Sequence, residues 1–250
     1  GNAYGKTALC DGLTAAIKKH EKKTDTLLFL GVDARYMVCE QAKKAIEVLE
    51  SAGVDFTALA DEPASGAQLD FLIGAANETK EQMTAAAKVL DTFKTVVVYD
   101  PNDAKALKQL YKEYGVELSC DVVTYTTYVA KLLKDGKLQP KDTGKTVVFQ
   151  DPYQLSRDLG ETEEPREIIE NYAVLGEMLL NRKETMWAGN ILMAQYLPEV
   201  IDEVARRRLF NAESIGATAM VTASVSEYHA LKHVNQDKIE ILSIEDLILG

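Results

Sequence analysis

Apolar residues follow two alternating patterns along the chain, short continuous runs and helical spacings. Continuous runs predict strands at 27–31, 54–59, 95–99, 116–118, 146–150, 177–180, 218–223 and 238–242. Helical spacing predicts helices at 7–22, 38–52, 76–92, 103–113, 125–134, from 164, and at 198–214, 226–233 and 244–248. Strands that alternate with helices are typical of parallel sheets covered by helices. The sequence therefore predicts an α/β protein.

The same order of elements occurs twice. In the first copy, strand 95–99 runs into Asp100-Pro101 and a helix. In the second copy, strand 218–223 runs into Ser224 and a helix. We therefore predict an internal duplication: two similar lobes, each a small parallel sheet flanked by helices. The expected domains are an N-terminal helical lead-in at 1–23, a first lobe at 24–142 and a second lobe at 143–250.

Composition narrows the classes of partner. The chain has 250 residues, of which 39 are acidic and 28 basic, giving a formal net charge of −11. Such a surface repels nucleic acid and anionic lipid, so we expect neither as a partner. No apolar run approaches the roughly 20 residues of a membrane span. The start, Gly1-Asn2-Ala3-Tyr4-Gly5, is neither an initiator methionine nor a signal peptide, so we expect a piece of a longer chain.

The three cysteines are Cys10, Cys39 and Cys120. Their spacing matches no metal or redox motif, and an odd count in a large chain argues against a disulfide framework. We therefore expect three unrelated thiols, partly or wholly buried, and a reducing cytoplasm as the location.

Several motifs lie at the expected strand ends. In the first copy they are Gly31-Val32, Glu62-Pro63-Ala64-Ser65-Gly66 and Asp100-Pro101-Asn102-Asp103. In the second copy they are the segments 150–157, 165–167, 181–189 and 221–227. These segments resemble the G-C, E-x-C-C-G, C-P-x-C, H-D-P-C-Y-L-G-R, P-R-E, C-C-G and V-T-A-C-P-x-C motifs of the cysteine-rich, CCG-domain family. That family includes heterodisulfide reductase subunits B and D and the iron–sulfur subunits of glycolate and lactate oxidases.

The resemblance covers nearly all of the chain, but no motif cysteine is retained. In the family these cysteines bind iron–sulfur clusters, and in some members they carry disulfide chemistry. Thiolate is the required ligand class for such clusters, and oxygen ligands do not select them. We therefore expect a degenerate member with no catalytic residues, no cluster and no cofactor. The degenerate positions are Val32, Ala64, Ser65, Asp100, Asp103, Tyr153, Trp187, Ala188, Ser224 and Glu227.

The replacements have a structural interpretation. Asp100 at an N-cap, Pro101 at the first helical position and Asp103 at the third together predict a well-capped helix start. Ser224 with Glu227 three residues later matches a capping box. The rings of Trp187 and Tyr153 are expected to fill the volume that a cluster would occupy.

A functional interpretation of the same region stays open. Asp100, Asp103 and Glu62 together would suit a hard cation such as magnesium, although capping explains both aspartates without one. His229 and His233 share a helix face but have no third ligand nearby in sequence. The run Arg206–Arg208 is expected to be a solvated helix face, with docking of an acidic partner as the alternative.

Three functions follow from these features. We favour an iron–sulfur oxidoreductase-related domain that scaffolds or regulates a redox complex, with a flavoprotein or iron–sulfur subunit as its partner. A second hypothesis is the C-terminal part of a longer protein whose clusters lie upstream. A third is a small-molecule binding protein or enzyme that uses a crevice between the lobes, because ligands bind beyond the carboxyl ends of parallel strands. The expected crevice residues are Asp100, Asp103, Tyr153, Arg157, Trp187 and Glu227.

Overall fold

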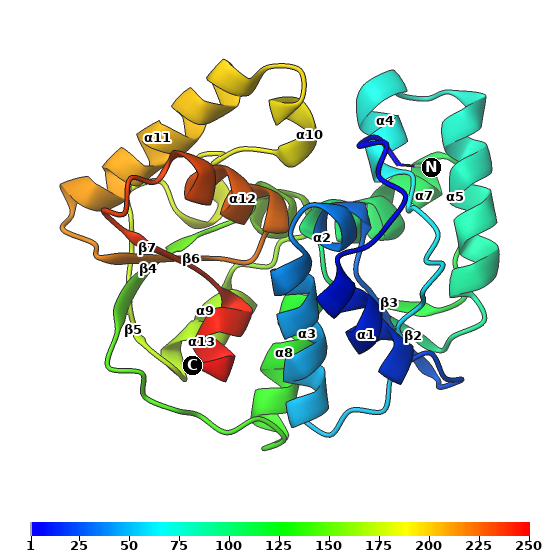
Figure 1. Ribbon diagram of the computed structural model, residues 1–250, viewed down its shortest axis with the longest axis horizontal. Helices are drawn as coiled ribbons and strands as arrows, with labels where there is room; N and C mark the ends of the chain where they lie inside the picture. Colours follow the sequence, from blue (N-terminus) through cyan, green and yellow to red (C-terminus); the bar gives the residue numbers. More distant parts are fainter. Residues whose placement is uncertain (1) are drawn as a thin grey trace. The chain divides into compact units, whose positions relative to one another are not determined.

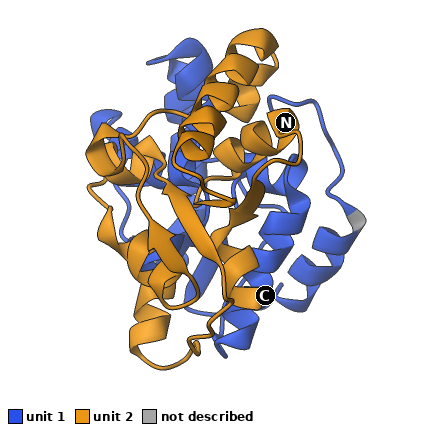
Figure 2. Cartoon of the chain, turned by 90° about the vertical axis from the view of Figure 1, so that its left-hand side faces the viewer, with its two compact units in different colours: residues 1–128 blue, residues 129–250 orange. Residues whose placement is uncertain are grey.

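The computed structural model describes residues 2–250 and divides the chain into two compact units (Figures 1 and 2). Unit 1 ends at Tyr128, and unit 2 runs from Val129 to Gly250. Both units are α/β, and each contains a parallel sheet with helices packed against it. The predicted α/β class is therefore confirmed. The predicted boundary at 142 stays a prediction, since the compact units divide at 128.

The sheet of unit 1 has three parallel strands in the order β1-β2-β3. They are β1 (Thr26–Phe29), β2 (Thr95–Val98) and β3 (Asp121–Thr124). Leu27 also forms a single parallel bridge to Thr57, which is what remains of the predicted strand 54–59. The predicted strand 116–118 is wrong. The Val116 N–H instead bonds to the Tyr111 carbonyl and closes the preceding helix.

The helices of unit 1 vary in how well the sequence predicted them. Helices over 38–52, 76–92, 103–113 and 125–134 are confirmed, whereas the predicted helix 7–22 is shorter and two short helices, α2 and α4, were not predicted. The helices are α1 (Asp11–Lys19), α2 (Val32–Tyr36), α3 (Cys39–Ser51), α4 (Ala67–Ile73), α5 (Asn77–Leu90), α6 (Pro101–Lys105), the π-helical turn η1 (Ala106–Leu110), α7 (Tyr111–Glu113) and α8 (Tyr125–Lys134), which crosses the division between the units.

The sheet of unit 2 has four parallel strands in the order β5-β4-β6-β7. They are β4 (Thr146–Gln150), β5 (Val174–Gly176), β6 (Ala219–Thr222) and β7 (Glu240–Ser243). The predicted strand 177–180 is wrong by three residues. The carbonyl oxygens of Leu179 and Leu180 bond to the buried Arg208 side chain and not to a neighbouring strand.

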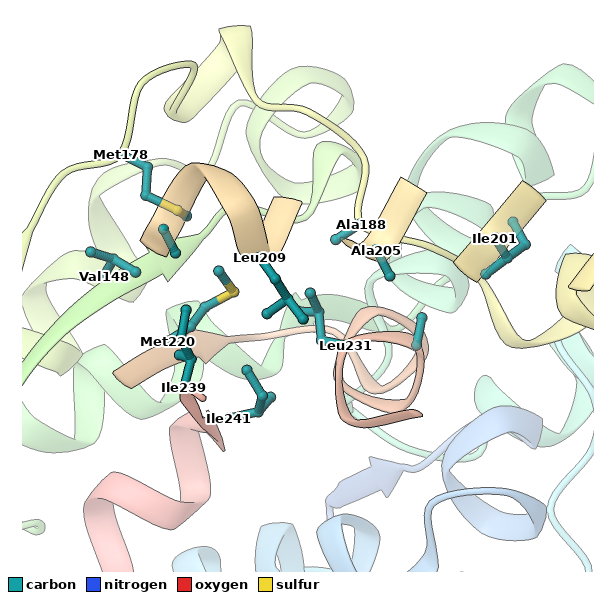
Figure 3. Close-up of a cluster of buried hydrophobic side chains, with 12 residues drawn as sticks. Val148, Met178, Ala188, Ile201, Ala205, Leu209, Met220, Leu231, Ile239 and Ile241 are labelled. Carbon is teal, nitrogen blue, oxygen red and sulfur yellow. The ribbon is translucent and has the colours of Figure 1, made fainter. Parts of the chain in front are cut away.

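The core of unit 2 lies between the sheet and the helices that follow it (Figure 3). Met220 of β6 and Ile241 of β7 pack with Leu209 and Leu231 from two helices, and all four side chains are buried. Full burial stabilises each such side chain by about 1.5–3 kcal/mol. The helical elements are η2 (Gln154–Asp158), α9 (Glu163–Glu170), η3 (Arg182–Glu184), α10 (Ile191–Ala194), α11 (Pro198–Ser214), α12 (Val225–Val234) and α13 (Ile244–Leu249).

Candidate functional site

The start of α6 forms one side of the candidate site in unit 1. Asp100 follows β2 and takes an extended backbone conformation, and its Oδ1 accepts a hydrogen bond of 2.8 Å from the Asn102 N–H. Pro101 occupies the first helical position. The predicted N-cap is therefore confirmed. The second carboxylate oxygen, Oδ2, is buried and has no hydrogen-bond partner in the described part of the chain.

Glu62 closes the carboxyl end of β1. Its two carboxylate oxygens accept 2.9 Å hydrogen bonds from the N–H groups of Leu30 and Gly31. The Arg35 guanidinium of α2 lies 3.5 Å from Glu62 Oε1, and both side chains are buried. Burial raises the pKa of Glu62, while Arg35 and the two backbone N–H groups oppose that rise. The charge of Glu62 thus has a cationic partner from the same unit.

A third acidic group, Asp33, belongs to the unpredicted helix α2 and is also buried. Its Oδ1 accepts hydrogen bonds of 2.6 Å from the Tyr4 hydroxyl and 2.6 Å from the Gln68 amide. Burial, followed by the nearby Asp33 charge, raises the pKa of Tyr4. The N-terminal segment is thereby held against α2 and α4.

Asp103 is the acidic group that contacts Ser65. The Ser65 hydroxyl donates a hydrogen bond to Asp103 Oδ1. Burial raises the pKa of Asp103 to about 7, against the lowering effect of that hydrogen bond. The Asp103 and Asp100 side chains lie together over Gly31, because a Cβ built there would collide with Asp103 Oδ2 and stand 3.4 Å from Asp100 Cβ. Burial, and then the charges of Asp33 and Asp103, raise the pKa of Asp100 well above its ordinary value.

Of these residues, Asp103, Ser65 and Gln68 border a cavity of about 280 Å³ within unit 1. Four of the ten degenerate motif positions line it, which shows that distant motif segments meet there. Sequence reasoning missed Asp33, Tyr4 and Gln68, although a polar residue directly after a strand-end motif is a signal that points to Asp33. The lining residues are Asn2, Ala3, Val32, Ala64, Ser65, Gly66, Gln68, Leu69, Leu72, Gln82 and Asp103.

The corresponding helix start in unit 2 is built differently. The Ser224 side chain accepts a hydrogen bond from the Glu227 N–H at 3.3 Å, as predicted. The Glu227 carboxylate does not complete the capping box. Instead it accepts from the Ala188 N–H at 3.2 Å and from the Gln150 amide at 3.1 and 3.2 Å. Burial raises the pKa of Glu227 to about 8, against these hydrogen bonds.

Gln150, at the end of β4, joins Glu227 to the fully buried Arg208. Arg208 Nε donates to Gln150 Oε1, and its two terminal nitrogens donate to the carbonyls of Leu179 and Leu180 at 3.1 Å. Burial lowers the pKa of Arg208, while Glu227 opposes that change. The prediction of a solvated basic run is therefore wrong for Arg208, because hydrogen bonds to Gln150 and to two backbone carbonyls take the place of water around its guanidinium.

A second ion-pair network stabilises the turn after β4. The Arg166 guanidinium binds both oxygens of Asp151, at 2.7 and 2.9 Å, and also both oxygens of Glu177. Asp151 Oδ2 accepts in addition the Arg182 N–H at 2.8 Å. Bidentate pairs of this kind fix both distance and orientation. The Asp151-Pro152 and Pro165-Arg166 segments, both retained from the motifs, thus hold each other.

The remaining predicted positions of unit 2 are spread around these networks. Ala188 is buried and Trp187 packs against the hydrophobic core. Tyr153 is half-buried under the exposed Arg157, whose guanidinium carbon lies 5.4 Å from the ring centre. Asp100 and Asp103 belong to unit 1 and the other expected crevice residues to unit 2. A crevice lined by all six residues stays a prediction.

Two other sequence features are placed by the structure. His233 Nε2 lies 3.7 Å from Asp202 Oδ1 on the neighbouring helix α11. Among the residues that the structure describes, no group of three or more His, Cys, Asp or Glu side chains is arranged to hold a metal ion. No helix within residues 2–250 combines the length and the apolar character needed to cross a membrane.

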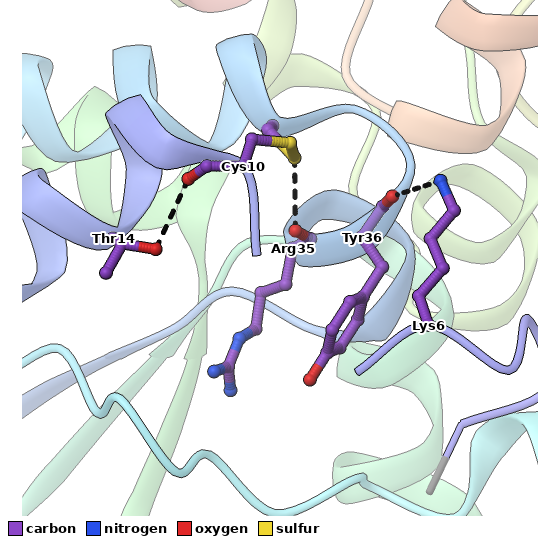
Figure 4. Close-up of a disulfide and its surroundings, with 6 residues drawn as sticks. Lys6, Cys10, Thr14, Arg35 and Tyr36 are labelled. Atoms are coloured by element: carbon purple, nitrogen blue, oxygen red, sulfur yellow. Dashed lines mark hydrogen bonds between the residues drawn. A yellow bond between two sulfur atoms is a disulfide. The ribbon is translucent and has the colours of Figure 1, made fainter. Parts of the chain in front are cut away.

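Cys10 and Cys39 form a disulfide, so the expectation of three unrelated thiols is wrong for this pair (Figure 4). The two residues are 29 positions apart, and the packing of α1 against α3 brings them together. Cys39 Sγ lies 3.1 Å from the carbonyl oxygen of Arg35, while Lys6 Nζ donates to the Tyr36 carbonyl at 2.9 Å. The disulfide and Lys6 thus fasten the N-terminal segment beside α2. Cys120 is a free thiol.

Comparison with known proteins places the chain near iron–sulfur oxidoreductases. It is 27% identical over 180 residues to a probable iron–sulfur-binding oxidoreductase, FadF, of Bacillus subtilis, which covers 69% of this chain and 25% of that protein. It is 29% identical to a probable membrane-anchored ferredoxin of Chromohalobacter salexigens, over 59% of this chain and 23% of that protein. An EtfAB:quinone oxidoreductase of Syntrophomonas wolfei is 30% identical over 59% of this chain and 21% of that protein.

The chain is therefore similar in sequence to iron–sulfur oxidoreductases and spans about a quarter of the length of these relatives. No protein-family model matches it. Among solved structures, an aspartate racemase homologue from Pyrococcus horikoshii is 12% identical with a TM-score of 0.37, over 90% of this chain and 96% of that one.

Proposed function

We propose that this chain is an iron–sulfur oxidoreductase-related domain that holds no cluster at its motif positions and serves as a scaffold or regulatory part of a redox complex. The observation that carries the proposal is the network around Glu227. Its carboxylate accepts hydrogen bonds from Gln150 and Ala188, so this motif position is occupied by the protein's own polar contacts. A buried, satisfied network of this kind leaves no donor for iron.

Strand order supports an origin by duplication. In unit 2 the order is β5-β4-β6-β7, and α12 begins directly after β6. In unit 1 the bridge to Thr57 adds a segment outside β1, giving the order Thr57-β1-β2-β3, and α6 begins directly after β2. The equivalent motif helices thus follow equivalent strands. We infer that the two units descend from one cluster-binding unit.

Exposed apolar side chains supply a surface for a protein partner. Tyr196, Leu197 and Val200 lie within five residues at the start of α11 and are about half exposed or more. Exposed apolar groups of this size mark interaction sites when they cluster. The proposed partner is a flavoprotein or iron–sulfur subunit, because the relatives are named as redox proteins, one of them for EtfAB and quinone.

The first experiment measures iron and acid-labile sulfide in anaerobically purified protein comprising residues 1–250. We expect neither, and a featureless visible spectrum. A brown protein with stoichiometric iron and sulfide would overturn the proposal. The matched variants Glu227→Gln and Gln150→Glu change the hydrogen bonds of this network without adding a thiolate. We expect both variants to be free of iron and sulfide as well.

Partner binding is tested separately by affinity capture of a flavoprotein or iron–sulfur subunit. We expect Val200→Glu to weaken capture, because it places a charge among the apolar side chains at the start of α11. Ile215→Glu is the matched control, since Ile215 is similarly exposed at the opposite end of that helix. Equal capture by both variants would exclude this surface, and absence of any redox partner would contradict the scaffold role.

A further inference from the structure

One carboxylate stands out on the wall of the cavity of unit 1. Within residues 2–250, Asp103 is the single ionisable side chain that lines it. The other polar groups are the amides of Asn2, Gln68 and Gln82 and the hydroxyl of Ser65. Val32, Ala64, Leu69 and Leu72 supply apolar surface. A ligand that fits this lining carries positive charge at one end and a short apolar portion beside it.

The acidic groups behind the wall sharpen that requirement. Glu62 already pairs with Arg35 and two backbone N–H groups. Asp100 has a buried carboxylate oxygen without a hydrogen-bond partner in residues 2–250. Asp103 receives one neutral hydroxyl donor, from Ser65. Buried carboxylates are costly unless they are paired or protonated, so this part of the unit is short of positive charge.

Asp100 and Asp103, which lack a cationic partner among the described contacts, lie at or next to the cavity. Asp103 lines it, and the Asp100 and Asp103 side chains lie side by side over Gly31. Burial raises the pKa values of both carboxyls, to about 7 for Asp103. Repulsion from Asp33 and Glu62 adds to the rise for Asp103. Repulsion from Asp33 and Asp103 adds to the rise for Asp100. Asp33 and Glu62 make the electrostatic potential at Asp103 more negative. Arg35 is the cation on this side of the unit, and it pairs with Glu62. A bound cation relieves that repulsion.

We propose that this cavity binds a small organic ammonium ion, with Asp103 as the direct acceptor of the N–H groups and Asp100 as the supporting charge. A primary alkylammonium matches the lining because its donors reach carboxylate and amide oxygens while its carbon chain meets the leucine, valine and alanine side chains. A hard divalent cation takes six or more oxygen ligands and gains nothing from that apolar surface. The volume of about 280 Å³ limits the ligand to a small molecule.

The site is independent of the proposed partner function, because every lining residue belongs to unit 1 and none to the surface at the start of α11. It also does not depend on a crevice between the units. Failure of partner capture therefore leaves this inference untouched, and failure of ammonium binding leaves the scaffold role untouched.

The test titrates the full chain with n-butylammonium and follows the methyl NMR signals of Val32, Leu69 and Leu72. The isosteric neutral probe is 1-butanol, and Mg²⁺ is the third probe. We expect saturable shifts with n-butylammonium, binding about tenfold weaker for 1-butanol, and no saturable shift of these methyl groups with Mg²⁺. Equal binding of the amine and the alcohol overturns the charge argument. Shifts from Mg²⁺ alone, or from none of the probes, overturn the proposal entirely.

Two variants locate the binding. Asp103→Asn keeps the shape and removes the charge, and we expect it to weaken n-butylammonium about tenfold while 1-butanol is unchanged. Ala64→Leu fills the cavity and keeps the charge, and we expect it to block both organic probes. Glu227→Gln is the matched control, because Glu227 is equally buried but bonded by its own unit. Undiminished binding by both Asp103→Asn and Ala64→Leu contradicts the site.

Discussion

The two units place acidic side chains at comparable helix starts but satisfy them in opposite ways. In unit 2, Glu227 accepts hydrogen bonds from Gln150 and Ala188, and Gln150 in turn accepts from Arg208. In unit 1, one oxygen of Asp100 has no partner among the described residues, and Asp103 borders a cavity. The difference teaches that a carboxylate at such a position closes a site only when the surrounding chain supplies its donors.

The largest expected effect concerns the closed network of unit 2. Arg208→Ala removes the donor from the buried Gln150 oxygen and from the carbonyls of Leu179 and Leu180, and opens a void in place of a fully buried side chain. We expect the free energy of unfolding to fall by about 3–5 kcal/mol, measured by urea denaturation. Arg207→Ala is the control, because Arg207 is the exposed neighbour of Arg208. It should change the free energy of unfolding by less than about 1 kcal/mol. Similar losses for both variants would show that the network is not what stabilises unit 2.

The next effect concerns how the open site of unit 1 is fastened. The Cys10–Cys39 disulfide closes a loop of 29 positions beside the segment that supplies Asn2 and Ala3 to the cavity. Reduction, or Cys10→Ser, should lower the free energy of unfolding by about 3 kcal/mol. Denaturation with and without a phosphine reductant measures it. Cys120→Ser serves as the control and should respond to the reductant as the native chain does, and an unchanged midpoint on reduction would argue against the bond.

The pH dependence of stability distinguishes the two carboxyls. Asp103 titrates at about 7 in the folded chain against an ordinary value of 3.8. A raised folded pKa means that the stabilising contribution is complete below the ordinary value and is lost as pH rises through 7. From pH 5 to pH 8 the native chain should therefore lose roughly 2 kcal/mol of stability that Asp103→Asn does not lose.

Glu227→Gln should remove a similar loss, but one that continues up to about pH 8, since burial raises the pKa of Glu227 to about that value. Thermal and urea unfolding at matched ionic strength, across this range, measure both differences. Identical pH profiles for the native chain and the two variants would show that neither carboxyl holds its proton on folding. If the native chain instead gained stability relative to Asp103→Asn as the pH rises, the Asp103 charge would have to be paired with a cation in the folded chain.

The smallest effect concerns the approach of Asp103 to the end of β1. Gly31→Ala and Gly53→Ala both place a side chain at a positive φ, of 85° and 64°. Only the Gly31 variant meets another group, Asp103 Oδ2, whereas nothing lies within 4 Å of a Cβ at Gly53. We expect Gly31→Ala to destabilise the chain by about 1–2 kcal/mol more than Gly53→Ala, and to displace the Ser65–Asp103 hydrogen bond. Equal losses in urea denaturation would mean that Asp103 moves away freely.

Long periodic segments were predictable, and short polar ones were not. The spacing of apolar residues correctly indicated α11 and α5, and the Asp100-Pro101 pair correctly indicated the start of α6. Helix α2 has five residues and buries Asp33 and Arg35, so its pattern carries no apolar stripe. Strand β3 was missed because it begins with an exposed aspartate and has only half-buried valines.

The site was predictable only in part for a related reason. Motif resemblance singled out Val32, Ala64, Ser65 and Asp103, which line one cavity of unit 1. The partners of those residues are set by tertiary packing. Arg208 looked like part of a solvated run because its neighbours in sequence are charged, yet the turn of α11 directs it inward. A disulfide between scattered cysteines likewise depends on how two helices pack, which spacing does not encode.

The network in unit 2 has a consequence for how this chain can change over generations. Gln150 contacts Glu227 and Arg208 at once, so replacing Gln150 removes a hydrogen-bond partner from both buried charged side chains. A substitution at Gln150 is therefore expected to cost stability at two buried groups together. The network therefore restricts substitution in unit 2 more than in unit 1, where Asp103 borders a cavity and has Ser65 as its hydrogen-bond donor.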